Sequence, residues 1–130
     1  MLEVDSLKSF IGDICARKVN VPKEDAFVAW FINVYLDKPE SEALKSITNG
    51  PNDQGIDAIV TDHPSQSVYL IQGKYRVFER NSKVPTESRS DVLAFAGIFP
   101  RIVDEDSRLR ILENANSRVS QKMRSAWKWI

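Results

Sequence analysis

The chain opens on a helical pattern. Apolar residues recur at steps of three and four from Leu7 to Cys15. Asp5 or Ser6 is available as a cap, so the spacing predicts an amphipathic helix that stops near Asn20. The single cysteine falls on the apolar side of this helix, where we expect a small buried side chain rather than a nucleophile.

Two further helices are predicted ahead of the first strand. Pro22 suits the first turn of the second helix, and Glu24 and Asp25 favour its positive end. Its predicted buried stripe consists of Phe27, Trp30, Phe31, Val34 and Tyr35. The Asp-Lys-Pro sequence at 37–39 ends it, and a short third helix fits residues 40–47.

A strand pattern follows. Residues 56–61 and 67–75 are rich in β-branched and aromatic side chains and flank a polar turn at 62–66. We expect an antiparallel hairpin whose paired residues have numbers that sum to about 129. Asp57 then lies opposite Gln72 or within one residue of it.

The rest of the chain is predicted to be helical after a surface loop at 77–87. A fourth helix is expected at 91–99, with Ser90 as its cap and Pro100 as its end. Its predicted core contacts are Val92, Leu93, Phe95 and Ala96. A long last helix is predicted from an apolar seam of Leu109, Leu112, Asn116, Val119, Met123, Ala126 and Ile130. This seam either docks on the core or holds a partner helix.

These elements predict a mixed α/β (α+β) fold in one domain of 130 residues. Its parts are a helical region at 1–49, a hairpin core at 50–78 and a helical region at 88–130. Two strands form a poor sheet, since three or more are normally needed. Further strands therefore come from a partner or a missing continuation of the chain, or the loops hide one.

Composition places the chain in a broad class. Residues 1–66 hold six Lys and Arg against eleven Asp and Glu, and residues 67–130 hold twelve against seven, so a net charge of zero hides two opposed halves. A positive half can face phosphates, or it can pair with the acidic half. One cysteine points to a reducing, cytoplasmic setting, and no apolar run approaches the ~20 residues that cross a membrane.

The open end of the predicted hairpin carries candidate chemistry. Opposed side chains have Cβ atoms roughly 5 Å apart, so the Asp57 carboxylate and the Gln72 amide can hold one hard cation, Mg²⁺ or Mn²⁺. The Gly73 carbonyl is a further possible ligand, and Lys74 shares a face with Gln72. Such a group suits phosphodiester hydrolysis. Alternatively, Asp57 caps a turn and the strand end emerges into solvent.

The sequence around these residues resembles a known superfamily. Gly-x-Asn-Asp-x-Gly-Ile-Asp-Ala at 50–58, followed by Leu-Ile-Gln-Gly-Lys-Tyr at 70–75, is similar to the PD-(D/E)XK restriction-endonuclease-like nucleases. More narrowly, it looks like the N-terminal nuclease domain of the AIPR (abortive infection phage resistance) family and the Mrr-like branch. Asp57, Gln72 and Lys74 match the Gln-x-Lys variant of the motif, over roughly residues 20–78.

The sequence departs from this family in two places. Related nucleases often carry a Glu after a Phe on the first core helix, whereas Val28 follows Phe27 here, which leaves Glu24 as the candidate substitute. The superfamily core also has a further strand, for which the chain has no obvious sequence. AIPR-like proteins are much longer, so we expect a fragment or a small relative whose sheet a partner completes.

Other residues invite weaker assignments. Arg76, Arg80 and Lys83, together with Arg89, follow the Lys74 segment and either track a phosphate backbone or form a solvated basic loop. Asp53 is expected to hydrogen-bond its own loop rather than bind a second metal. The only histidine, His63, is expected to be a solvated turn residue. Trp127 and Trp129 are either core anchors or a partner patch.

The resemblance implies a Mg²⁺-dependent DNA endonuclease of phage defence or restriction. The first alternative is a catalytically inactive nuclease-fold module that binds nucleic acid or protein. The second is an assembly subunit, in which the 109–130 helix mediates a homodimer or contacts a missing C-terminal segment.

Overall fold

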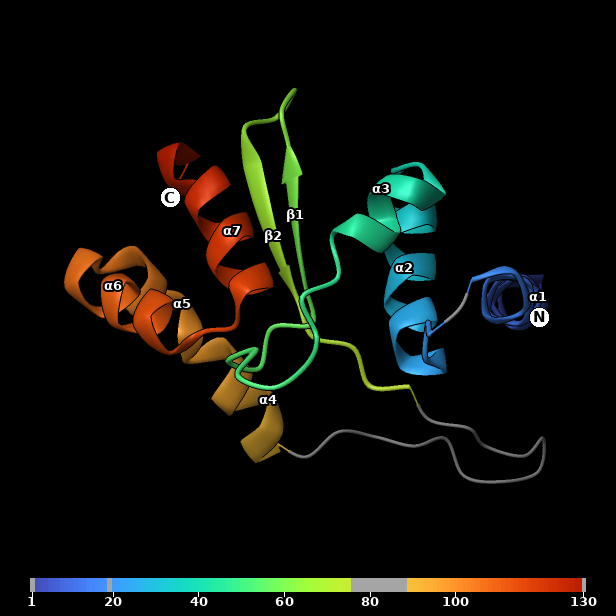
Figure 1. The fold of residues 1–130 in the computed structure, drawn as a ribbon, viewed down its shortest axis with the longest axis horizontal. Coiled ribbons are helices and arrows are strands. Elements are labelled where there is room, and N and C mark those ends of the chain that lie inside the picture. Colours follow the sequence, from blue (N-terminus) through green and yellow to red (C-terminus); the bar gives the residue numbers. More distant parts are fainter. Residues whose placement is uncertain (1, 19, 76–88, 130) are drawn as a thin grey trace.

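The computed structural model describes residues 2–18, 20–75 and 89–129 (Figure 1). The mixed α+β class is confirmed. The elements, in chain order, are α1 (Leu2–Arg17), α2 (Lys23–Tyr35), α3 (Glu40–Lys45), β1 (Ala58–Asp62), β2 (Ser67–Ile71), α4 (Arg89–Ala96), α5 (Ile98–Val103), α6 (Glu105–Asn114), α7 (Ser117–Ser125) and a 3₁₀ turn (Trp127–Trp129).

The hairpin has the predicted register. β1 and β2 pair antiparallel from Ala58 opposite Ile71 to Asp62 opposite Ser67, so the paired numbers sum to 129. The alternating pattern and the short polar turn leave no other register that buries the same apolar residues.

The loop after α3 makes a single bridge to β1, and the sheet of the described residues has two strands. The predicted third helix ends at Lys45 rather than at 47, because the next residues pair with β1. Ile47 forms a bridge with Ala58, and the Ile59 amide donates to the Ser46 carbonyl at 3.0 Å. This single bridge is not a third strand, so the described residues show none of the three sources considered for a further strand.

The hairpin stands between two layers of helices (Figure 1). Side chains on its two faces alternate, as strand geometry requires. Ala58 and Val60 pack into a cluster with α2 and α3, whereas Ile59 packs on the opposite side against α5, α6 and α7. Burial on both sides explains why β1 begins with three apolar residues, Ala58 to Val60, whereas β2 is only half-buried and its Tyr69 is exposed. α1 packs against α2 through a third cluster around Ile14.

The predicted buried stripe of α2 is wrong in part. Trp30 is buried and Phe27 half-buried, but Phe31, Val34 and Tyr35 are 37%, 48% and 52% exposed. A face of smaller and aliphatic side chains lets the helix lie close to β1, while the exposed aromatics stack on one another at its edge. The buried residues of α2 are Ala26, Val28, Ala29, Trp30 and Ile32.

The predicted fourth helix is wrong in its bounds. It is two helices, because α4 ends at Ala96 and α5 begins after Gly97. Pro100 does not end a helix but lies in the first turn of α5, where backbone N–H groups lack a partner within the helix in any case. Ser90 lies inside α4 rather than before it.

The predicted core contacts of this region are also wrong. Val92 and Leu93 are 55% and 57% exposed, Ala96 is exposed, and Phe95 is only half-buried. The core contacts of this region come instead from α5, whose isoleucines are buried in the C-terminal cluster. These residues are Ile98 and Ile102.

The single long C-terminal helix is wrong as well. Asn116 interrupts it as the N-cap of α7, where its side chain accepts a hydrogen bond from the Val119 amide at 2.9 Å. Docking on the core is confirmed, because most of the predicted seam lies in the interior of the chain. The buried seam residues are Leu112, Val119, Met123 and Ala126, whereas Leu109 is 44% exposed.

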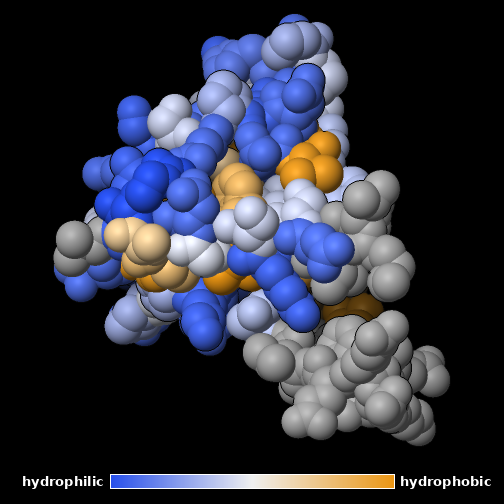
Figure 2. All heavy atoms as spheres, turned by 90° about the vertical axis from the view of Figure 1, so that its right-hand side faces the viewer, coloured by the Kyte–Doolittle hydropathy of each residue, from blue (hydrophilic) through white to orange (hydrophobic). Residues whose placement is uncertain are grey.

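The surface is mostly polar on the side that carries α1. Figure 2 shows this face as largely hydrophilic, with small separated apolar spots. Within the part of the chain that the structure describes, no helix is long and apolar enough to cross a bilayer.

Candidate active site

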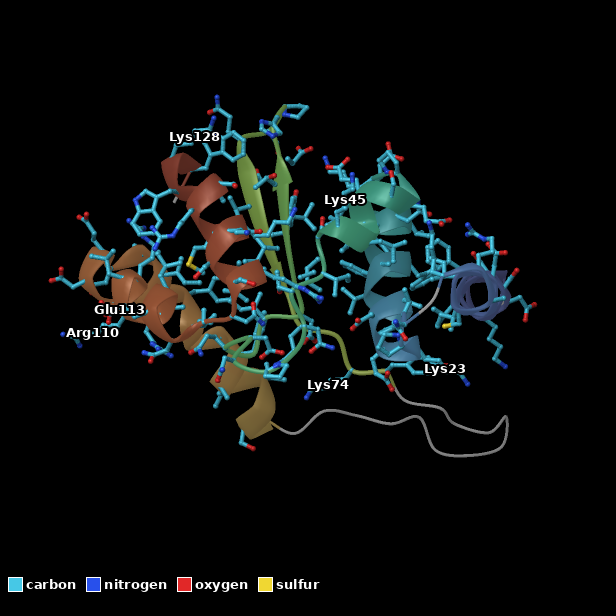
Figure 3. All side chains as sticks on the ribbon, viewed as in Figure 1. Lys23, Lys45, Lys74, Arg110, Glu113 and Lys128 are labelled. Carbon is cyan, nitrogen blue, oxygen red and sulfur yellow. The ribbon has the colours of Figure 1, made fainter. Side chains whose placement is uncertain are left out.

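A pocket of about 490 Å³ opens at the end of the hairpin away from its turn. Its walls come from the first turns of α2, the loop between α3 and β1, and the segment that follows β2. Figure 3 labels Lys74 at this lower end of the hairpin. The lining residues are Glu24, Val28, Asn49, Asp53, Gly55, Asp57, Gln72, Gly73, Lys74 and Tyr75.

The four residues predicted to be catalytic therefore line one cavity. Asp57 directly precedes β1, Gln72 directly follows β2, and Lys74 lies two residues farther along. The hairpin register places these three together, because Asp57 and Gln72 continue the pairing that ends at Ala58 and Ile71. Glu24 reaches the same pocket from α2, where it is exposed in the first turn.

Asp57 is the most constrained of these groups. Its amide donates to the Ile71 carbonyl at 2.8 Å, and its carboxylate Oδ2 accepts from the Gly73 amide at 2.8 Å. Its carbonyl accepts from the Thr48 amide at 2.8 Å. The carboxylate therefore joins the open ends of the two strands rather than capping a turn, and its Oδ1 has no hydrogen-bond partner among the described residues and remains available to a ligand.

The electrostatic surroundings of Asp57 favour a positive partner. Burial raises the pKa of this half-buried carboxyl, and the nearby negative charges of Asp53 and Asp25 raise it further. The Gly73 N–H and the Lys74 ammonium act in the opposite direction but do not outweigh burial. An ionised Asp57 therefore carries an unfavourable charge that a bound cation would relieve.

Gln72 and Gly73 are held by close contacts. The Gln72 amide Nε2 donates to the Gly55 carbonyl at 3.2 Å, which leaves the amide oxygen without a described partner. Gly73 has no room for a side chain, because a Cβ there would lie 2.6 Å from Cγ2 of Val28. The glycine between Gln72 and Lys74 therefore lets this segment lie directly against α2.

The loop before β1 forms one wall of the pocket. Asp53 accepts hydrogen bonds from the Gly55 amide at 2.9 Å and the Gly50 amide at 3.2 Å, which confirms the predicted loop role. Gly55 has a φ of +77°, a conformation that favours glycine. Asn49 donates to Asp25 of α2 at 2.8 Å, so the loop is tied to the helix across from it.

The donor set fits a hard cation. Carboxylate, amide and main-chain carbonyl oxygens are the ligands that Mg²⁺ and Mn²⁺ prefer, and Asp57, Gln72 and Gly73 offer one of each. Within the residues that the structure describes, no three His, Cys, Asp or Glu side chains are grouped closely enough to hold a metal by themselves. The ligands predicted from the sequence for a cation at this place are the Asp57 carboxylate, the Gln72 amide and the Gly73 carbonyl, and all three residues line the pocket.

The predicted nucleic-acid contacts are not among the residues that the structure describes. The loop at 77–87 with Arg80 and Lys83, and also Arg76 and the side chain of Arg89, fall outside the described residues. His63 is exposed in the hairpin turn, as expected, with its ring 4.8 Å from that of Trp129.

The two C-terminal tryptophans, Trp127 and Trp129, are both half-buried, and each makes a ring contact. Trp127 packs on the C-terminal core cluster, and the buried Arg108 guanidinium lies 3.8 Å from the centre of its ring. Trp129 packs against His63 at the tip of the hairpin. The core-anchor alternative is thus the one observed for Trp127.

Sequence reasoning did not assign Val28, Asn49 or Tyr75 to the pocket. Asn49 joins the loop to α2, and no local pattern marks it. Tyr75 closes the pocket beside Lys74, and its ring centre lies 5.6 Å from that of Phe27. An aromatic residue directly after the Gln-Gly-Lys sequence was the one available signal.

No family model, curated protein or solved structure matches the chain.

Proposed function

We propose that this protein hydrolyses DNA phosphodiester bonds with a divalent cation, in phage defence or restriction. One observation carries the proposal: Glu24, Asp57, Gln72 and Lys74, which are separated by up to 50 positions in the sequence, line the same pocket. The resemblance to the restriction-endonuclease-like nucleases supports the same reaction, since its motif residues are three of these four.

The residues of the chain divide the work as follows. Asp57 and Gln72 would hold Mg²⁺ with the Gly73 carbonyl, and Glu24 would contribute from the helix. A bound Mg²⁺ supplies polarisation of a phosphoryl oxygen and a more acidic water. The Gly73 N–H fixes the Asp57 carboxylate, so that its free oxygen keeps one direction.

Lys74 is suited to the anionic side of the reaction. Its side chain is exposed at the rim of the pocket, next to the carboxylate of Asp57. An ammonium at this position can donate a hydrogen bond to the attacking water or to a non-bridging oxygen, where negative charge develops. Lys74 is therefore the residue that we assign to transition-state stabilisation.

The test is cleavage of plasmid DNA in Mg²⁺ and in EDTA. We expect wild-type cleavage only with the metal, and a loss of roughly a hundred- to a thousandfold in Lys74→Ala and in Asp57→Asn. Lys23→Ala is the matched control, because Lys23 is an exposed lysine of α2 that does not line the pocket. Undiminished cleavage by Lys74→Ala would rule out the proposed role.

A second function is favoured by the position of Glu24. This acid lies in the first turn of α2 and is exposed. The nucleases that the sequence resembles carry their acid farther along the helix, directly after a Phe, where this chain has Val28. A nuclease-fold module that binds nucleic acid or protein without cutting it would need no acid there. Tight Mg²⁺ or Mn²⁺ binding that Asp57→Asn abolishes would count against this alternative.

A further inference from the structure

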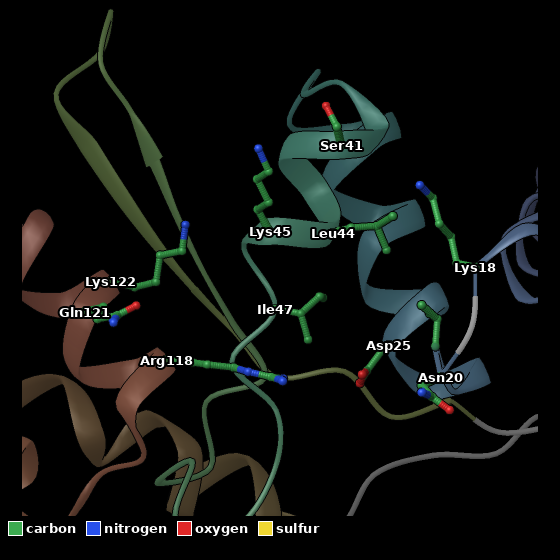
Figure 4. A pocket seen from close by; sticks show the side chains of 11 residues that line it. Lys18, Asn20, Asp25, Ser41, Leu44, Lys45, Ile47, Arg118, Gln121 and Lys122 are labelled. Carbon is green, nitrogen blue, oxygen red and sulfur yellow. The ribbon is translucent and has the colours of Figure 1, made fainter.

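A second hollow of about 570 Å³ lies between the N-terminal helices and α7. Four basic side chains line it, Lys18, Lys45, Arg118 and Lys122, against a single acid, Asp25. Figure 4 shows Lys45 and Lys122 on neighbouring walls, with Arg118 extending from α7 toward the side of Asp25. We refer to this hollow as the basic groove.

Among the residues that the structure describes, no acidic side chain forms an ion pair with a cation of the groove. Within the described residues, ion pairs join Arg17 to Asp13 and Glu40, and Lys38 to Asp62, and none of these pairs includes a basic side chain of the groove. The one acid in the groove is already engaged, because Asp25 accepts a hydrogen bond from Asn49 at 2.8 Å. A local excess of positive charge in a protein of net charge zero is a site for an anion.

The groove adjoins the candidate active site. Asp25 lines the groove, its neighbour Glu24 lines the catalytic pocket, and Asn49, which holds Asp25, lines the catalytic pocket as well. The Asp25–Asn49 pair is therefore a wall that the two hollows share. A single small anion would occupy one hollow, whereas a chain of phosphates can extend over the wall into both.

The other lining groups fit a nucleic-acid strand. Asn20, Ser41 and Gln121 offer neutral hydrogen bonds of the kind that contact phosphate and sugar oxygens. Leu44 and Ile47 give the groove an apolar part, against which sugars can pack. Lysine and arginine on several elements, rather than on one loop, suit an extended ligand.

We propose that the basic groove binds the phosphate backbone of the DNA whose cleavage we assign to the neighbouring pocket. This inference rests on the proposed function for the identity of the ligand. It assigns Lys45 of α3 and Lys122 of α7 as phosphate contacts that position the strand and do not take part in bond cleavage.

The test is binding of a fluorescent DNA duplex in EDTA, so that cleavage does not interfere. The double variant Lys45→Gln with Lys122→Gln should weaken binding roughly ten- to a hundredfold at about 0.1 M salt. It should also reduce the slope of log K against log salt by about 2, one per lysine. Circular dichroism should be unchanged, since neither side chain is fully buried.

Arg110→Gln with Lys128→Gln is the matched control. It removes the same charge from exposed positions that do not line the groove (Figure 3), and should change the affinity by less than about twofold. Equal weakening by both double variants, or none by the groove variant, overturns the proposal. Failure of the wild-type protein to bind the duplex would also overturn it. The same holds if a nucleoside triphosphate binds in the groove and DNA does not compete with it.

The two proposals fail separately. Lys74→Ala should lose cleavage, and it should weaken binding of the duplex in EDTA less than the groove variant does, because it removes one positive charge rather than two. DNA binding that depends on the groove without any cleavage would refute the proposed function alone. Cleavage that the groove variant retains in full, together with unchanged binding, would refute the groove alone.

Discussion

The carboxylate of Asp57 holds the open end of the hairpin together, and its charge is unfavourable in the folded protein. Its carboxylate fixes the Gly73 amide at the open end of the hairpin, yet burial and the nearby Asp53 and Asp25 raise its pKa. A group whose pKa is raised on folding binds its proton more tightly in the folded state. Its contribution to stability therefore falls as the pH rises through that raised pKa, and the ionised carboxylate is a cost near neutral pH.

Asp57→Asn should therefore unfold at a higher temperature than wild type near neutral pH without divalent cations. Asparagine keeps an acceptor for the Gly73 N–H but carries no charge. The difference should fade as the pH falls through the raised pKa of Asp57 and should be gone below the ordinary aspartate pKa of 3.8. Thermal unfolding followed by circular dichroism across this range measures it.

Asp62→Asn is the control with the opposite sign. Hydrogen bonds from Lys38 and Ser65 lower the pKa of Asp62 to about 2, so this carboxylate stabilises the fold above the ordinary value of 3.8. The variant should be less stable than wild type near neutral pH, and this deficit should vanish as the pH falls through about 2. A destabilised Asp57→Asn near neutral pH would contradict the account of the site.

At the scale of elements, Asn116 joins the last helices to the loop of the site. Its side chain caps α7, and its Nδ2 donates to the carbonyls of Thr48 and Pro51 at 3.0 and 3.2 Å. The backbone N–H of Asn116 donates to the Asn52 carbonyl at 2.8 Å. One residue thus ends the predicted long helix and holds the loop that carries Asp53.

Asn116→Ala should destabilise the protein by about 2–3 kcal/mol, because it removes a cap and two further hydrogen bonds. Asp104→Ala is the matched comparison: it removes the cap of α6, where the side chain of Asp104 accepts a hydrogen bond from the Ser107 amide at 3.0 Å and, among the described residues, bonds no loop carbonyl or amide of the site. Its expected cost is about 1 kcal/mol. Urea unfolding of both variants gives the difference, and equal losses would show that the loop contacts of Asn116 add nothing.

At the scale of the whole molecule, the hairpin is the centre that both helical layers share. Ile56 and Ile59 belong to the C-terminal cluster, Ala58 and Val60 to the N-terminal one, and all four are almost fully buried. The two layers therefore depend on the same strand. The candidate pocket lies at the open end of the hairpin, and the basic groove lies between the N-terminal helices and α7.

This arrangement predicts an order of hydrogen exchange. The amides of Thr48, Asp57 and Ile59, which bond across β1 and its neighbours, should exchange slowest, close to the rate of global unfolding. The amides of α4 should exchange fastest among the helices, since Val92 and Leu93 are mostly exposed. Exchange followed by NMR tests this, and slow exchange in α4 would indicate a contact that covers it.

Local patterns predicted well where one physical rule acted alone. The hairpin register followed from alternation and turn length, and the residue numbers alone were enough to put Asp57 beside Gln72. The loop role of Asp53 followed from a short polar side chain near glycines. Prediction failed where two rules competed: Pro100 reads as a helix end but also suits a first turn, and Asn116 fits a seam but caps a helix better.

The sequence by itself determined which regions are helical, the hairpin and its register, and the placing of Asp57, Gln72 and Lys74 at one end of that hairpin. Each of these depends on residues that are near neighbours or are paired through one turn. The tertiary structure alone decided that Glu24 reaches their pocket. It also decided that Lys18 and Lys45, from the acidic half of the chain, join Arg118 and Lys122 in one basic groove. Charge and spacing along a chain do not fix distances between separate elements, whereas packing on the two faces of the hairpin does.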